Sequence, residues 1–171
     1  MTESHWERTS SRGEELIIDT FSLADYEAVA RLWDEGGPGV SRRPTDGFEG
    51  VRLKLSRDPD LFLVARLGTA VVGVVIGGFD GWRAYVYHLA IAPAYRRRGI
   101  ASALMDELEA RLRAKGALKA KCQIMVGNDV SLAFFRQRGY EIEDFTVPAG
   151  KWLTDWRPEE PQDETQTTGS D

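Results

Sequence analysis

The stretch "LAIAPAYRRRGIASALMDELEARL", from Leu89 to Leu112, combines the signals that decide the fold. Its first residues end a run rich in β-branched and aromatic residues, which favours a strand, and Pro93 then interrupts strand pairing because it lacks an amide hydrogen. From about Gly99 to Ala114, apolar residues recur four apart, which predicts an amphipathic helix. That stripe consists of Ile100, Leu104, Leu108 and Leu112. The sequence therefore predicts a strand–turn–helix unit with three arginines and a glycine at the junction.

The segments on either side extend this unit into a larger pattern. The runs that read as strands are 15–21, 61–67, 70–79, 82–91, 119–126, 140–147 and 151–156. The runs with helical spacing are 23–35, 48–56, 99–114 and 128–138. We expect a single α/β domain over residues 14–156, with a mixed, mostly antiparallel sheet of six to seven strands flanked by about four helices. Residues 1–13 and the acidic tail 157–171 are polar, and we expect them to be disordered.

The charge of the chain is unevenly distributed. The formal net charge is −5, but residues 157–171 contain five acids and one base, so the rest of the chain is nearly neutral. Between Arg96 and Lys121, eight Lys and Arg residues stand against three acids. A domain that binds duplex nucleic acid is usually basic over a whole face, whereas one local excess fits a small anionic ligand. We therefore expect no nucleic-acid partner.

Several other classes of protein do not fit the composition. No apolar run approaches the about 20 residues that span a bilayer, and the first residues lack the apolar core of a signal peptide. The two histidines, His5 and His88, and the single Cys122 give no spacing typical of a metal site. We expect a cytoplasmic protein with no metal and no membrane contact, either a monomer or a homodimer.

The arginine-rich junction has the properties of an anion site. The first turn of a helix leaves its amides without partners and carries the positive end of the helix dipole. Gly99 lets an anion approach these amides closely, and Ala101 keeps the adjacent surface small. The arginines add charged, fork-shaped donors. The spacing matches neither the phosphate loop of nucleotide-binding ATPases nor the dinucleotide-binding motif. A solvent-exposed basic helix start is the alternative interpretation.

The junction resembles the acetyl-CoA signature of the GNAT N-acetyltransferases, R/Q-x-x-G-x-G/A, at Arg96, Gly99 and Ala101. A second segment of that family, N…LY…GF, is similar to Asn128, then "FF" at 134–135, then "GY" at 139–140. The order of elements agrees from residue 15 to about 156, or about four-fifths of the chain. The sequence is most similar to small bacterial members of the ribosomal-protein alanine acetyltransferase type.

The resemblance implies acetyl-CoA as co-substrate and an amine as acceptor. The residues implied to bind the phosphates are Arg96, Arg97, Arg98, Gly99, Ile100, Ala101 and Ser102, with Arg97 and Arg98 on the outer phosphates. The residues implied to contact the pantetheine arm, in a gap between the fourth and fifth strands, are Leu89, Ala90, Ile91, Asn128 and Phe135. The Ile91 amide would also polarise the thioester carbonyl. The implied reaction is direct transfer in a ternary complex to a protein N-terminus, a lysine or a small-molecule amine.

The catalytic residues of the family are only partly matched. Phe135 stands where many members have a tyrosine that protonates the leaving thiolate, so Tyr140 and Tyr87 are the candidates to replace it. Tyr85 stands where some members have a glutamate base. His88 could act as the base instead, and strand alternation predicts that it faces opposite Tyr85 and Tyr87. Packing roles for these side chains, and a base formed by a water chain, are the alternatives.

The acceptor is expected over the segment "WDEGGPGVSRRPTDGFEG", residues 33–50. Its acids could hold a cationic amine, and its bases could hold a carboxylate; they are Asp34, Glu35 and Asp46, and Arg42 and Arg43. About one lysine in 2,500 is neutral at pH 7, against about one α-amine in five to ten. The absence of a strand carboxylate therefore slightly favours an α-amine or a small amine. A non-catalytic module that binds acetyl-CoA is the alternative function.

Overall fold

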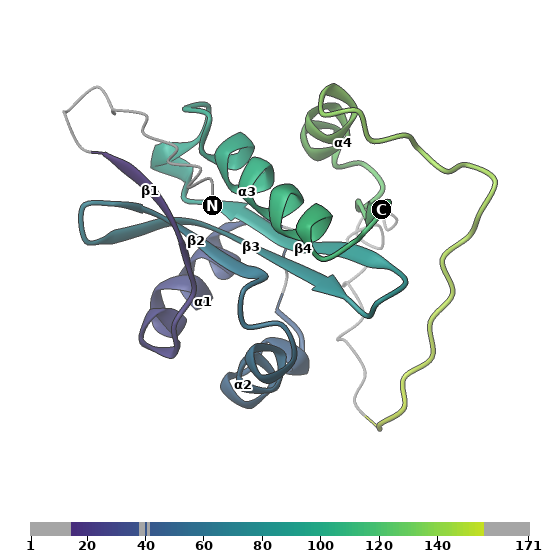
Figure 1. The fold of residues 1–171 in the computed structure, drawn as a ribbon, viewed down its shortest axis with the longest axis horizontal. Helices are drawn as coiled ribbons and strands as arrows, with labels where there is room; N and C mark the ends of the chain where they lie inside the picture. The colour runs from purple at the N-terminus through teal and green to yellow at the C-terminus, as the bar shows by residue number, and fades with distance from the viewer. Residues whose placement is uncertain (1–14, 38–39, 41, 156–171) are drawn as a thin grey trace, which may run out of the picture.

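The centre of the molecule is a five-stranded sheet in the order β1-β2-β3-β4-β5 (Figure 1). This is a computed structural model, and it describes residues 15–37, 40 and 42–155. The strands are β1 (Leu16–Thr20), β2 (Phe62–Leu67), β3 (Ala70–Phe79), β4 (Ala84–Ile91) and β5 (Ala120–Cys122). The first four pair antiparallel in chain order, and β5 joins β4 in parallel. The predicted mixed, mostly antiparallel α/β sheet is confirmed.

Helices cover both faces of this sheet (Figure 1). One face carries α3 (Ile100–Ala114), and the other carries α1 (Tyr26–Glu35) and α2 (Phe48–Arg57). After β5 the chain forms α4 (Asp129–Gln137). Short 3-10 helices precede α1, α2 and α3; they are η1 (Leu23–Asp25), η3 (Pro44–Asp46) and η4 (Pro93–Tyr95). All four predicted α-helices are confirmed. The sequence predicts them because the apolar residues of each are spaced as in a helix that packs on one side.

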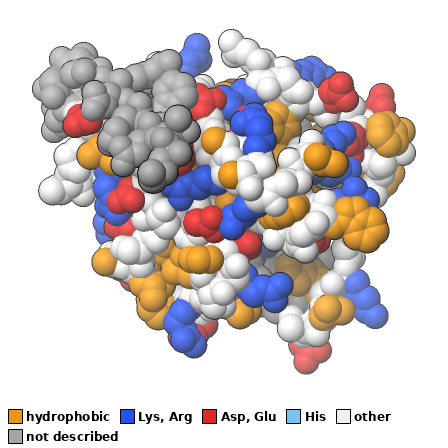
Figure 2. Space-filling view, viewed as in Figure 1, with side chains coloured by type: hydrophobic (Ala, Val, Ile, Leu, Met, Phe, Trp, Pro, Cys, Tyr) orange, Lys and Arg blue, Asp and Glu red, His pale blue; other side chains and the backbone are white. Residues whose placement is uncertain are grey.

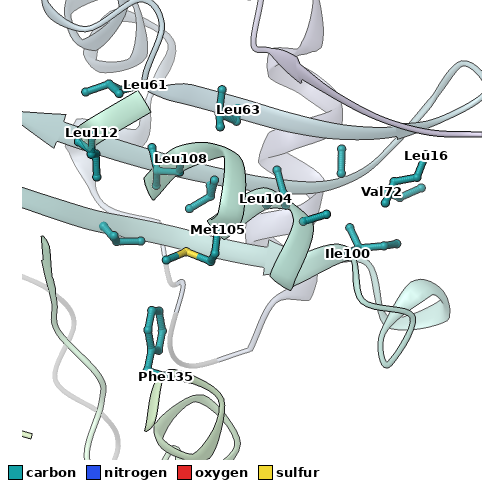
Figure 3. Close-up of a cluster of buried hydrophobic side chains, with 14 of the residues drawn as sticks. Leu16, Leu61, Leu63, Val72, Ile100, Leu104, Met105, Leu108, Leu112 and Phe135 are labelled. Atoms are coloured by element: carbon teal, nitrogen blue, oxygen red, sulfur yellow. The ribbon is translucent and has the colours of Figure 1, made fainter. Parts of the chain in front are cut away.

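Two apolar clusters hold the helices to the sheet. The predicted stripe of α3 lies in the first cluster, and Leu104 and Leu108 have no exposed surface. Figure 3 shows these side chains directed onto the strands, with Phe135 of α4 reaching toward Met105. Trp33 of α1 and Phe62 of β2 belong to the second cluster, on the opposite face. Each fully buried leucine or phenylalanine contributes about 1.5–3 kcal/mol of transfer free energy.

Two glycines of β3 allow α3 to lie close to the sheet. A Cβ added at Gly73 would stand 2.7 Å from Cδ1 of Ile91 and 3.1 Å from Cδ1 of Leu104. One added at Gly77 would stand 2.5 Å from Cδ1 of Leu108. The small residues in the run "GVVIGG" therefore fix how closely the helix that follows the arginine turn approaches β3 and β4.

The expectation of six to seven strands is wrong, since the sheet has five. Among the described residues, none after β5 forms a strand, although 140–147 and 151–155 have the alternating pattern. An alternating pattern produces a strand only where a partner edge can pair with it, and β5 is three residues long. The segment after α4 instead contacts β5 through Glu143, which binds Lys119 and Lys121 at 2.7 and 2.6 Å. Residue 156 and both expected disordered ends lie outside the described residues.

Within the described part of the chain, no helix combines the length and the apolar character needed to cross a bilayer.

Candidate active site

The edge of β4 that faces β5 is unpaired along its second half. Among the described residues, β5 pairs only with Ala84–Val86 of β4. Ala92 donates its N–H to the Val72 carbonyl on the β3 side, at 2.9 Å. Because backbone groups alternate between the two edges of a strand, the N–H and carbonyl of Ile91 point to the open edge. Leu89 and Ile91 therefore have backbone groups on the open edge, whereas those of Ala90, which lies between them, point toward β3.

The turn after β4 leads to the amides in the first turn of α3. Gly99 is the N-cap at φ 81°, a left-handed conformation that glycine adopts without strain. The first intrahelical bond runs from the Ala103 N–H to the Gly99 carbonyl at 3.0 Å, so the amides of Ile100, Ala101 and Ser102 precede it. This turn contains no acidic residue. It therefore presents free amide donors and the positive end of the helix dipole, as predicted for an anion site.

The three arginines before Gly99 are exposed, but they differ in what they contact. Arg96 turns back, and its Nε donates to the carbonyl of Ile91 at 3.1 Å. Arg97 adopts a φ of 62°, and the Arg98 guanidinium lies 5.2 Å from the ring centroid of Tyr95. Figure 2 shows Lys and Arg side chains interspersed with acidic and apolar ones on the face that carries α3. Arg97 and Arg98 are thus the outward-facing cations of this turn, and Arg96 fixes the end of β4.

Two residues implied to contact the pantetheine arm have structural partners. Asn128 is the N-cap of α4, and its Oδ1 accepts a hydrogen bond from the Ser131 N–H at 3.1 Å. Phe135 is 6% exposed, and its ring centroid lies 5.0 Å from that of Tyr140 and 5.4 Å from that of Phe134. Asn128 therefore starts α4, and Phe135 belongs to the core.

A β-bulge changes the direction of His88. Two residues of β4, His88 and Leu89, stand opposite the single residue Val75 of β3. His88 has a φ of 50°, a left-handed conformation that is uncommon for a residue other than glycine and that occurs at the first position of one type of bulge. The imidazole lies on the α1 side of the sheet, with its centroid 5.1 Å from the ring of Trp33.

The predicted opposition of His88 to Tyr85 and Tyr87 is wrong. The two tyrosine rings are stacked with centroids 5.9 Å apart, and a Cβ at Gly78 would lie within 3.5 Å of both Tyr87 and Lys54 of α2. Tyr87 therefore faces the same side as His88, because strict alternation fails at the bulge. Burial, followed by the nearby Tyr85, raises the pKa of Tyr87 above its usual value.

His88 forms a pair with a buried carboxylate. Its Nε2 lies 3.0 Å from Oδ1 of Asp46, and the side chains are 19% and 8% exposed. The other carboxylate oxygen of Asp46 accepts the Arg43 N–H at 2.7 Å. Burial opposes ionisation of Asp46, but the hydrogen bonds from His88 and Arg43 outweigh it and lower the pKa. Because an ionised carboxylate only accepts hydrogen bonds, Nε2 of His88 is the donor in this contact.

This pair could not have been found from spacing. Asp46 was predicted only as a possible partner for a cationic amine, and it stands 42 residues from His88 in the sequence. The bulge that turns His88 toward it leaves no mark in the alternation of apolar residues. The only available signal was the 3-10 turn "PTD" at Pro44–Asp46, which holds the carboxylate at the start of α2.

Tyr140, the other tentative acid, lies on the opposite side of the sheet. It packs against the α3 cluster, and its Oη lies 3.4 Å from Oε1 of Glu109. Burial and then the Glu109 carboxylate raise the pKa of Tyr140 strongly. The three tentative catalytic side chains are therefore not brought together: His88 and Tyr87 share one face, and Tyr140 belongs to the other.

A cavity of about 590 Å³ adjoins the Asp46 side of this pair, and its wall includes Trp33, Asp34, Arg42, Arg43 and Asp46. Arg42 binds Asp34 in a two-pronged ion pair at 2.7 and 2.9 Å. The α1 wall lies next to the end of β4, because Nη2 of Arg96 is 3.5 Å from the carbonyl of Glu35. Over the described residues, no group of three or more His, Cys, Asp or Glu side chains could hold a metal ion.

Comparison with known proteins agrees with this architecture. A sequence profile described as "Acetyltransferase (GNAT) family" matches residues 26–140. The chain is 38% identical to Acetyltransferase SG1711 of Sodalis glossinidius over 136 residues, which cover 80% of this chain and 94% of that protein. Acetyltransferase YE1169 of Yersinia enterocolitica gives the same values.

A solved structure, the PaiA N-acetyltransferase of Thermoplasma acidophilum in complex with coenzyme A, matches with a TM-score of 0.68 at 21% identity. The match covers 75% of this chain and 91% of that chain. At this identity the structural match supports the fold, and the names of the two related acetyltransferases specify no acceptor.

Proposed function

The chain belongs to the GNAT acetyltransferase family, and on this premise we propose that it moves the acetyl group of acetyl-CoA to a primary amine by direct transfer in a ternary complex. The observation that carries the proposal is the continuity of two donor surfaces. The open edge of β4 leads directly into the uncapped first turn of α3. On the α1 side of the same strand lie the His88–Asp46 pair and the adjacent cavity.

Acetyl-CoA fits the first of these surfaces by its chemistry. Its pantetheine amides can pair with the backbone groups on the open edge of β4 as an added strand would. Its pyrophosphate can accept from the amides of Ile100, Ala101 and Ser102, with Arg97 and Arg98 adding charge. A hydrogen bond to a charged group is worth about 1.5–3 kcal/mol, so several of them give firm binding. The bound co-substrate supplies an activated acetyl group as a thioester.

His88 is the residue that we assign as the general base. The acceptor amine must lose its proton, and a positioned imidazole contributes about 10²- to 10⁴-fold to such a step. Asp46 fixes the ring through Nε2, so the proton is taken at Nδ1. The amine nitrogen then bonds to the carbonyl carbon while the Ile91 N–H stabilises the developing oxyanion. The carbon–sulfur bond breaks, the thiolate leaves with both electrons, and the nitrogen releases its second proton to solvent, which leaves a neutral amide.

The protonation state of Cys122, the single cysteine of the sequence, supports direct transfer. Burial raises the pKa of Cys122 to about 11, so its thiol stays protonated near neutral pH and is a poor nucleophile for an acetyl-enzyme. The leaving thiol of coenzyme A is itself acidic, with a reference pKa of about 8.5. The thiolate can therefore depart and take a proton from solvent, which is consistent with Phe135 in the core and no tyrosine acid at that position.

The test is release of free thiol from acetyl-CoA in the presence of a panel of primary amines. We expect thiol release that depends on both protein and amine, together with thermal stabilisation of the protein by acetyl-CoA. Stabilisation by acetyl-CoA with no thiol release for any amine would support the alternative, a non-catalytic acetyl-CoA-binding module. Failure of acetyl-CoA to bind at all would overturn the proposal.

A further inference from the structure

The cavity beside Asp46 has an imbalance between its hydrogen-bond donors and acceptors. Both oxygens of Asp34 are occupied by Arg42, at 2.7 and 2.9 Å. Both oxygens of Asp46 are also occupied, one by His88 and one by the Arg43 N–H. Of the three acidic side chains that were possible partners for a cationic acceptor, the two in the wall of this cavity therefore already have partners within the protein; the third, Glu35, is not part of that wall.

The donors at the same cavity are not all used. The Arg43 side chain is exposed and forms no hydrogen bond or ion pair with any described residue. The Nε1 of Trp33 also lacks a hydrogen-bond partner among the described residues, but this side chain is only 1% exposed, so the N–H is not open to a ligand in the cavity. The donor in the cavity wall that a ligand can reach is therefore the Arg43 guanidinium, and its best partner is an anion.

From this imbalance we propose that the cavity binds an acceptor that carries a carboxylate close to its primary amine, as a small amino acid does. The inference rests on the proposed acetyl transfer and names the class of its acceptor. Arg43 binds the carboxylate, and the amine lies on the Asp46 side of the cavity, toward the His88–Asp46 pair. A volume of about 590 Å³ suits a small molecule, and the two acids of its wall are already paired with Arg42 and His88, which disfavours a polycationic amine.

The experiment compares matched pairs of acceptors, a set of L-amino acids and the corresponding L-amino-acid amides. Each pair shares a side chain and an α-amine and differs in the carboxylate. We expect kcat/KM to be about tenfold or more higher for the acid, which corresponds to one charged hydrogen bond. The amide has the less basic amine and so the larger neutral fraction, which biases the comparison against the proposal. Equal or faster acetylation of the amides, or of spermidine, would overturn it.

Two variants identify the residue responsible. Arg43→Gln should raise KM for the acids by about tenfold or more while KM for acetyl-CoA and the rates with amides stay unchanged. The matched control is Arg52→Gln, which removes an exposed arginine of α2 that pairs with Glu49 away from the cavity. An equal effect of Arg43→Gln on acids and amides would contradict the assignment.

A binding measurement keeps this inference separate from the proposed function. Calorimetric titration of the coenzyme A-loaded full chain with N-acetyl-L-amino acids and their amides needs no turnover. Tighter binding of the acids, lost in Arg43→Gln, would support the carboxylate site even if no amine is acetylated. Equal binding of the two series would refute the site while leaving acetyl transfer intact.

Discussion

At the scale of single residues, the site depends on one extra residue in β4. The bulge turns His88 toward Asp46, and the resulting pair gives the imidazole a fixed orientation. Tyr140, one of the two tyrosines that were candidates to move a proton, contacts Glu109 on the far face of the sheet. Proton transfer is therefore assigned to the α1 side of β4 and not to the aromatic cluster around Phe135.

This assignment predicts different outcomes for two conservative substitutions. His88→Gln should lower kcat by about 10²-fold or more, because the base is lost, with KM for acetyl-CoA unchanged. Tyr140→Phe should leave kcat within about twofold, since the hydroxyl contacts Glu109 on the far face of the sheet and its raised pKa makes it a weaker acid. Steady-state rates of thiol release give both values. The opposite ranking of the two variants would transfer the catalytic role to Tyr140.

Asp46 also predicts a pH dependence of stability. Its folded-state pKa lies below the unfolded value of 3.8, so its contribution is full above that value and is lost as the pH falls through the folded pKa. Asp46→Asn should therefore lower the free energy of unfolding at pH 7 by about 1–3 kcal/mol. The difference between wild type and variant should shrink below about pH 4. Urea unfolding at several pH values measures it, and a gap that widens in acid would contradict the account.

At the scale of elements, the junction of β4 and α3 is where we propose that the pyrophosphate binds. The amides of the first turn of α3 and the arginines before Gly99 are donors, and no acidic residue competes with a ligand there. The closeness of α3 to β3 keeps this turn beside the open edge of β4. Substitutions in the first turn of α3 test the anion site, and substitutions of glycines in β3 test the packing of α3.

Ser102→Glu places a negative charge in the first turn of α3. We expect the Kd for acetyl-CoA to rise about tenfold or more, because the carboxylate repels the pyrophosphate, whereas the helix itself is stabilised by an acid at its N-terminus. Ala110→Glu adds the same charge at an exposed position two turns later and should leave the Kd unchanged. Calorimetric titration measures both. Equal Kd values for wild type and Ser102→Glu would remove the anion site from this turn.

Two glycines of β3 form a matched pair for the packing of α3. A Cβ at Gly73 would clash with Ile91, Leu104 and Ile100 at 2.7–3.2 Å, whereas one at Gly78 meets its nearest atom at 3.4 Å. Gly73→Ala should lower the free energy of unfolding by about 1–3 kcal/mol, and Gly78→Ala should not lower it. Chemical denaturation separates the two, and equal stability would show that α3 can move away at no cost.

At the scale of the whole molecule, much of the fold was predictable because apolar spacing records which face of an element is buried. The stripe of Ile100, Leu104, Leu108 and Leu112 predicted α3 and its packing on the sheet. The same type of pattern failed after α4, where residues 140–155 alternate but find no strand to pair with. The pattern of apolar residues shows which face of a segment can be buried, but a segment forms a strand only if a neighbouring strand can pair with it.

The site was predictable to the extent that it is continuous in sequence. The strand end, the arginine turn and the first turn of α3 follow one another from Leu89 to Ser102, and the structure places them together. The Asp46–His88 pair, the Arg42–Asp34 pair and the bulge depend on contacts between distant segments. Contacts between distant segments produce no regular spacing of residues in the sequence. The arrangement around the proposed acceptor site could therefore be found only from the structure.

The central claim is direct transfer between two substrates held on the two sides of β4. The most direct measurement is the initial rate of thiol release over a grid of acetyl-CoA and acceptor concentrations. Because both substrates must be bound before the acetyl group moves, the double-reciprocal lines should intersect. Parallel lines, together with protein that gains the mass of an acetyl group from acetyl-CoA alone, would indicate an acetyl-enzyme and contradict the account.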